Sequence, residues 1–145
     1  MSRSQDEFVA TFRDRCRRQG LAFTHQRQLI YRALLNSSDH PSPESIYEVV
    51  RREIPSISLA TVYKNVKTFI DAGLLREVTV HHGSLRLDAN LEPHHHLVCR
   101  VCRSIMDVPE SDMKPARFKG KLPKGFKVQR QTVEIIGICA RCAKQ

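Results

Sequence analysis

The residues best suited to chemistry lie in "PHHHLVCRVC" (Pro93 to Cys102), where three consecutive histidines precede a Cys-x-x-Cys pair. A second pair, "CARC", follows 36 residues later. A Cys-x-x-Cys turn presents two thiolates to one ion, and Zn²⁺ prefers four soft or borderline ligands in a tetrahedron. The spacing therefore predicts one closed structural zinc site, formed by Cys99, Cys102, Cys139 and Cys142.

The alternative for a Cys-x-x-Cys pair is redox chemistry, but thioredoxin-type motifs lie at a strand-to-helix junction and need no second copy. The chain has no run of 18 apolar residues and no apolar signal-peptide core, so we expect a cytoplasmic protein without a membrane span. Disulfides are rare in that compartment. The fifth cysteine, Cys16, shares an apolar helical stripe with Phe8 and Phe12, which predicts a small buried side chain without a function.

The histidine run predicts a second metal site. Side chains alternate along a strand, so His94 and His96 would share one face while His95 points to the other. The first cysteine turn sends the chain back as a hairpin, which brings Asp107 to the level of His96. Two imidazoles and a carboxylate suit Fe²⁺, Mn²⁺ or Zn²⁺. A histidine-rich surface strand that binds no metal is the alternative.

The segment before these motifs has the pattern of a DNA-binding domain. Apolar spacing predicts helices at about 5–19, 26–36, 43–53 and 59–72, then strands at Leu75–Val80 and Ser84–Asp88 separated by "HHG". This order is typical of a winged helix-turn-helix, in which helix 59–72 would enter the major groove. A solvated polar face is the alternative for that helix. Its predicted outward side chains are Thr61, Tyr63, Lys64, Asn65, Lys67 and Thr68.

We therefore predict an α+β protein with a winged-helix domain at 1–88, a hinge at 89–93 and a small zinc-stapled α/β domain at 94–145. Residues 1–93 hold 13 Lys and Arg against 11 Asp and Glu, whereas residues 94–145 hold 11 against 4. The basic run 114–130 fits a solvated face equally well, so charge alone does not locate a nucleic-acid surface. The second domain is too short to bury much core, and zinc would stabilise its fold.

Six segments in order resemble the ferric uptake regulator (Fur) superfamily of bacterial metal-dependent transcription factors. They are "GLAFTHQR", "HPSPESIY", "SLATVYKNV", "AGLL", "HHHLVCRVC" and "GICARC", and they span most of the chain. The resemblance implies a homodimer with C-terminal dimerisation domains, which binds a palindromic, A·T-rich double-stranded DNA operator. It also implies that Arg27 contributes to DNA binding together with the residues of helix 59–72.

The same resemblance implies a regulatory Fe²⁺ or Mn²⁺ ion held by His40, Asp88, His94, His96 and Asp107. Aspartate at 107 is typical of the peroxide-responsive branch, whereas iron-level regulators typically carry glutamate. In that branch Fe²⁺ reacts with hydrogen peroxide, a ligating histidine is oxidised and the protein leaves DNA; here His40 and His94 would be the targets. Manganese supports DNA binding without that reaction. An iron-level regulator with the same ligands is the alternative.

Three features of the sequence depart from the family pattern. Ala22 stands where many members carry a minor-groove Lys or Arg, although Arg17 or Arg18 is a substitute. Gln131 replaces a histidine of a third metal site, and prolines at 115 and 123 predict a short or broken helix in 111–125. We expect a regulator and no enzyme; a metalloenzyme or a zinc-stapled RNA-binding module are the remaining classes.

Overall fold

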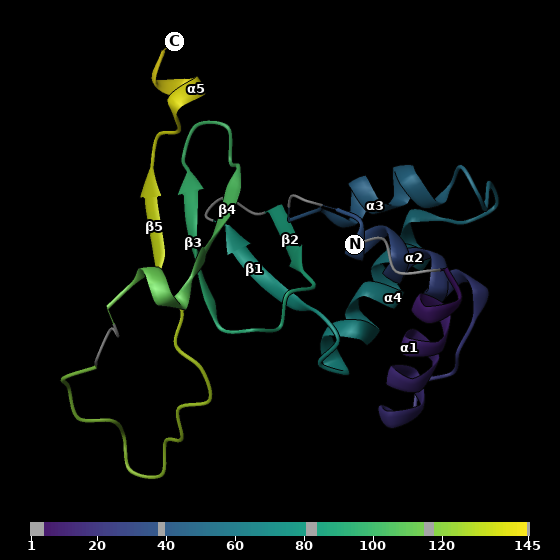
Figure 1. Cartoon of the computed structure of the whole chain (residues 1–145), viewed down its shortest axis with the longest axis horizontal. Helices are drawn as coiled ribbons and strands as arrows, with labels where there is room; N and C mark the ends of the chain where they lie inside the picture. Colours follow the sequence, from purple (N-terminus) through teal and green to yellow (C-terminus); the bar gives the residue numbers. More distant parts are fainter. Residues whose placement is uncertain (1–4, 38–39, 81–83, 115–117, 145) are drawn as a thin grey trace. The chain divides into compact units, whose positions relative to one another are not determined.

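The computed structural model describes residues 5–37, 40–80, 84–114 and 118–144. It divides into two compact units, Met1–Leu91 and Glu92–Gln145 (Figure 1). The division falls inside the predicted hinge. Among the described residues, no helix is long and apolar enough to cross a membrane.

The four predicted helices of the first unit are present. They are α1 (Gln5–Arg18), α2 (His25–Leu35), α3 (Pro43–Val50) and α4 (Leu59–Asp71). Ser42 and Ser58 cap α3 and α4, each accepting the backbone N–H three residues ahead. Gly73, at φ +70°, ends α4, and Leu74 N–H then bonds back to the Phe69 carbonyl at 2.8 Å.

An aromatic core holds these helices together. The rings of Phe12 and Tyr31 stack at 4.5 Å, and Phe69 of α4 meets both edge-on. Cys16 is fully buried beside them, as the stripe predicted, and burial raises the pKa of its thiol. The core therefore fixes α4 against α1 and α2.

A two-stranded antiparallel hairpin completes the first unit. β1 (Arg76–Val80) pairs with β2 (Ser84–Asp88), so that Arg76 lies opposite Asp88. The "HHG" turn at 81–83 lies outside the described residues. Leu87 N–H bonds to the Pro41 carbonyl at 2.9 Å, which ties β2 to the segment before α3. The helices and hairpin form the predicted winged helix-turn-helix.

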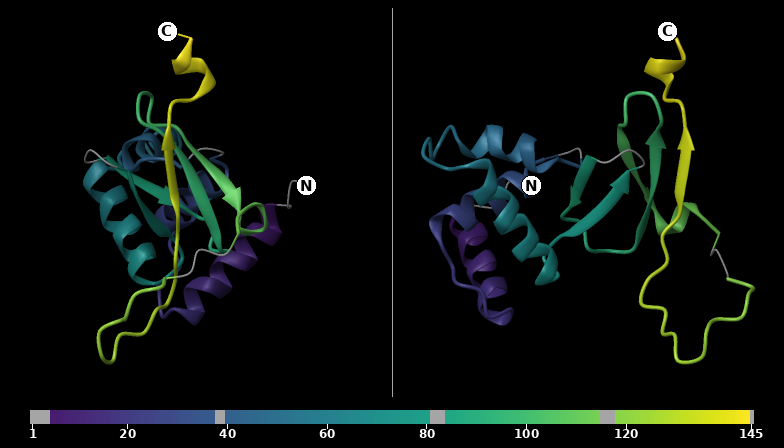
Figure 2. Two further views of the ribbon diagram at one scale, coloured as in Figure 1. Left: turned by 90° about the vertical axis from the view of Figure 1, so that its left-hand side faces the viewer. Right: turned by 180° about the vertical axis from the view of Figure 1, so that it is seen from behind.

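The second unit is a three-stranded sheet in the order β4-β3-β5 (Figure 2). The central strand β3 (His94–Cys99) pairs antiparallel with β4 (Ile105–Pro109) and parallel with β5 (Glu134–Gly137). A 3₁₀ turn η1 (Glu110–Asp112) follows β4, and the short helix α5 (Ala140–Ala143) follows β5. The described part of 113–133 contains no helix, in agreement with the predicted interruption; Pro115 itself lies outside the described residues.

Candidate metal centres and DNA-binding surface

The four paired cysteines converge at one end of the second unit's sheet. Cys99 ends β3, and Cys102 lies in the turn to β4. Cys139 is the N-cap of α5, and Cys142 lies within that helix. Their sulfur atoms all lie within 4.8 Å of one another, and the Cys102 and Cys139 sulfurs are 3.7 Å apart. Tetrahedral zinc with bonds of about 2.3 Å requires sulfurs about 3.8 Å apart. The cluster therefore fits the predicted zinc site.

Neighbouring polar groups stabilise thiolates in this cluster. The Ser104 side chain, its backbone N–H and the Arg141 guanidinium hydrogen-bond to Cys102 and lower the pKa of that thiol to about 5. The Cys139 N–H lies 3.4 Å from the Cys99 sulfur and lowers the pKa of Cys99. A hydrogen bond with Cys139 raises the pKa of Cys142 to about 12. Zinc binds thiolates, so its binding would displace the remaining thiol protons.

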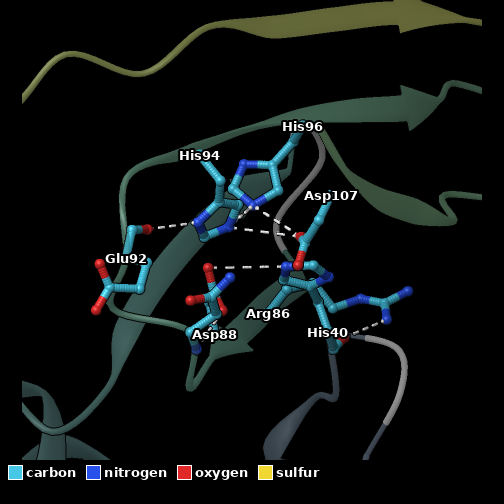
Figure 3. A network of polar contacts seen from close by, with 8 residues as sticks. His40, Arg86, Asp88, Glu92, His94, His96 and Asp107 are labelled. Atoms are coloured by element: carbon cyan, nitrogen blue, oxygen red, sulfur yellow. Dashed lines mark hydrogen bonds and ion pairs between the residues drawn. The ribbon is translucent and has the colours of Figure 1, made fainter. Parts of the chain in front are cut away.

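The histidine run forms a compact ligand group in the same sheet. Asp107 is the direct cross-strand partner of His96, as the hairpin predicted. Asp107 Oδ1 lies 3.5 Å from His94 Nε2 and 3.6 Å from His96 Nε2, and the two imidazole nitrogens are 3.0 Å apart (Figure 3). Nitrogens at right angles on an ion with bonds of about 2.1 Å lie about 3.0 Å apart. These three side chains therefore fit neighbouring positions around one metal ion.

Hydrogen bonding orients the first histidine for coordination. His94 Nδ1 lies 2.7 Å from the Glu92 carbonyl, which accepts a hydrogen bond only if Nδ1 carries the proton. The lone pair then belongs to Nε2, the nitrogen that faces His96 and Asp107. Outer hydrogen bonds of this kind fix the tautomer of metal-binding histidines.

His95, the middle histidine, stays out of this group as strand alternation predicted. It is 9% exposed, and its Nδ1 accepts a hydrogen bond from the Val133 N–H at 3.1 Å.

Two further predicted ligands lie together in the first unit. His40 Nε2 is 3.8 Å from Asp88 Oδ2, and both side chains are buried (Figure 3). The Asn90 N–H donates to Asp88 Oδ1 at 2.8 Å, and the Arg86 guanidinium donates to the His40 carbonyl at 2.8 Å. The end of β2 therefore holds this histidine and carboxylate side by side.

A groove lies between helix α4 and the hairpin. The groove has a volume of about 620 Å³ and is lined by residues of α4 together with Glu77 and Leu85 of the hairpin. Lys64 is exposed, whereas Lys67 pairs with Asp71 at 3.1 Å. The Tyr63 hydroxyl donates to the Glu44 carboxylate of α3, which raises the pKa of Tyr63 and lowers that of Glu44. This bond fixes the tyrosine at the edge of the groove.

The predicted outward position of Asn65 is wrong. Asn65 is only 9% exposed, and its Oδ1 accepts a hydrogen bond from Arg27 Nε at 3.1 Å. Its Nδ2 donates to the Thr61 carbonyl at 2.9 Å. Three residues after Val62 and four before Phe69, Asn65 falls on the inward face of α4. Arg27 also donates to the Ala22 carbonyl at 2.7 Å. Arg27 therefore links the start of α2 to α4 through Asn65, and to the segment before α2 through Ala22.

Comparison with known proteins identifies the family of this chain. The model of the ferric uptake regulator family matches residues 18–136. The chain belongs to the ferric uptake regulator family. The peroxide-responsive repressor PerR of Staphylococcus epidermidis is 33% identical over 129 residues, covering 89% of this chain and 86% of the relative. PerR of Staphylococcus aureus strain Mu50 is 34% identical over 126 residues, covering 87% and 85%.

Solved structures of this family have the same fold. A Campylobacter jejuni peroxide stress regulator superposes with a TM-score of 0.65 at 26% identity, covering 92% of this chain and 98% of that one. The Helicobacter pylori ferric uptake regulator Fur superposes with a TM-score of 0.73 at 19% identity, covering 100% and 99%.

Sequence reasoning missed three residues that support the cysteine cluster and the surface of α4. Ser104 and Arg141 stabilise the Cys102 thiolate, and Glu44 holds Tyr63. The positions of Ser104 and Arg141, two residues after one cysteine and one before another, offered a weak signal. No sequence signal pointed to the contact between Glu44 of α3 and Tyr63 of α4, because the two residues are nineteen positions apart.

Proposed function

We propose that this protein is a metal-dependent, DNA-binding transcriptional repressor that senses hydrogen peroxide. The ligand group of His94, His96 and Asp107 carries the proposal, because its spacing suits one ion and its carboxylate is the aspartate of the peroxide-responsive branch. The two PerR relatives support the same assignment. The regulatory ion would be Fe²⁺ or Mn²⁺, since imidazole and carboxylate ligands accept both.

In this proposal the family pattern adds His40 and Asp88 to the ligand set. They belong to the first unit and the other three ligands belong to the second, so one ion would restrain the orientation of the two units. Metal would promote DNA binding only if it binds the DNA-competent orientation more tightly than the others. Removing the metal would then release the operator.

Hydrogen peroxide would react with the Fe²⁺-loaded protein and oxidise one of the histidine ligands. One oxygen atom of hydrogen peroxide would be added to an imidazole carbon of His40 or His94, and the other would leave as water. The oxidised ring would be a poorer ligand, so the ion would dissociate and DNA binding would fall. Mn²⁺ would support DNA binding without this reaction.

The DNA surface would be the outer face of α4 and the hairpin. Tyr63, Lys64 and Lys67 line the groove beside α4 and offer a hydroxyl and two cations. Such groups contact phosphates and base edges. Thr61 would contribute at the start of the helix, and Arg27 would place its remaining guanidinium N–H groups near a phosphate.

A homodimer would present two such helices to a two-fold symmetric operator. The second unit supports this assembly with exposed apolar side chains, which a second copy would cover. They are Met106, Ile135, Ile136 and Ile138, each between 44% and 53% exposed.

A gel-shift experiment tests the proposal. Duplexes selected from a two-fold symmetric, A·T-rich library are titrated with metal-free, Mn²⁺ and Fe²⁺ protein, before and after low peroxide. We expect DNA binding with either metal, loss only in the peroxide-treated Fe²⁺ sample, and a histidine product heavier by one oxygen atom. Metal-dependent binding that survives peroxide without this product would instead indicate an iron-level regulator. Failure to bind any duplex would refute the DNA-binding proposal.

A further inference from the structure

The middle histidine of the run has a partner that the metal sites do not explain. His95 Nδ1 accepts the N–H of Val133, the residue directly before β5, at 3.1 Å. The adjacent His96 N–H donates to the Val133 carbonyl, also at 3.1 Å. Both backbone groups of Val133 are therefore held by neighbouring residues of β3.

This contact stands where β5 begins its parallel pairing with β3. From there the register places His96 opposite Glu134 and Cys99 opposite Gly137. Two bonds follow at the far end: Arg100 N–H to the Gly137 carbonyl at 3.0 Å, and Cys139 N–H to the Cys99 sulfur at 3.4 Å. The strand thus runs from the histidine contact directly to the second cysteine pair.

Burial of side chains does not define the register of strand β5. It is four residues long, lies at the sheet edge, and all four residues are exposed. A slip by one residue would move Cys139 by about 3.3 Å and turn each side chain to the opposite face. The Cys102 and Cys139 sulfurs, now 3.7 Å apart, would no longer fit one zinc ion.

We propose that His95 is a positioning residue that sets the register of β5 and so brings the second cysteine pair to the zinc site. The ring acts through Nδ1 as a hydrogen-bond acceptor and needs no metal of its own. Its role is independent of the regulatory ion and of peroxide sensing.

Two substitutions separate this role from others. His95→Asn retains an acceptor because Asn Oδ1 occupies nearly the position of His Nδ1, whereas His95→Phe keeps the bulk and removes the acceptor. In the zinc-loaded protein we expect His95→Phe to speed amide exchange of Val133 and zinc transfer to a chelator by about tenfold, the scale of one lost buried hydrogen bond. His95→Asn should stay within about twofold of the parent.

Unchanged exchange and zinc transfer in His95→Phe would overturn the proposal, as would equal defects in both variants. Weakened Mn²⁺ binding in both variants with normal zinc retention would show His95 to be a ligand instead. The parent protein gives a test that does not depend on folding of a variant. Nitrogen-15 spectra should show neutral His95 with its proton on Nε2, and a proton on Nδ1 would exclude the contact.

Discussion

The part-buried hydrogen bond between Arg27 and Asn65 gives the sharpest prediction for the first unit. Asn65→Ala removes the acceptor of Arg27 Nε, a bond of 3.1 Å between α2 and α4. Hydrogen bonds to charged groups contribute roughly 1.5–3 kcal/mol, and partial exposure of Arg27 reduces this to about 1–2 kcal/mol. For a domain of this size, each kcal/mol corresponds to a Tm change of about 4–8 °C.

A double-mutant cycle with Arg27→Ala measures the contact itself. Denaturant unfolding of the parent, both single variants and the double variant should give a coupling energy of about 1–2 kcal/mol. Lys64→Ala is the matched control, because Lys64 lies exposed on the same helix. Its unfolding free energy should change by less than about 0.5 kcal/mol, while its DNA affinity falls and its salt dependence weakens.

The opposite pattern would refute this reasoning. If Asn65→Ala left stability unchanged and lowered DNA affinity as Lys64→Ala does, Asn65 would face the DNA as its sequence position first suggested. A coupling energy near zero would likewise show that the two side chains do not act together.

Three further predictions concern the metal sites and α4. Removing zinc with a chelator should cost the second unit on the order of 10 kcal/mol and unfold it, which amide exchange would detect as lost protection in β3 while α4 stays protected. Asp107→Glu should keep metal-dependent DNA binding but reduce histidine oxidation by peroxide, measured by mass spectrometry; full oxidation would argue against the branch assignment. The Tyr63 bond lowers the pKa of Glu44, so its stabilisation is complete above the ordinary carboxyl pKa and is lost as pH falls through the lowered value. Glu44→Gln should abolish that acid-range dependence, and an unchanged profile in unfolding experiments would contradict it.

Much of the fold was accessible from local sequence patterns. The helix bounds follow apolar periodicity and caps such as Ser42 and Ser58, whose hydrogen bonds reach only three residues ahead. The register of β3 and β4 was also predictable, because a short turn leaves few ways to pair two neighbouring strands. His96 opposite Asp107 follows from that constraint.

The sequence by itself determined the chemistry of the ligand sets: four paired thiols, and alternating histidines beside an aspartate. Each Cys-x-x-Cys pair and the histidine run are local motifs, and the preference of zinc for four such ligands implied that the two distant cysteine pairs share one ion. Only the tertiary structure decided which polar residues support the sites. Asn65 turns inward to Arg27, 38 residues away, and His95 meets Val133 at the same separation. Contacts at that distance depend on how whole elements pack, and a buried polar group is stable only where packing supplies its partner.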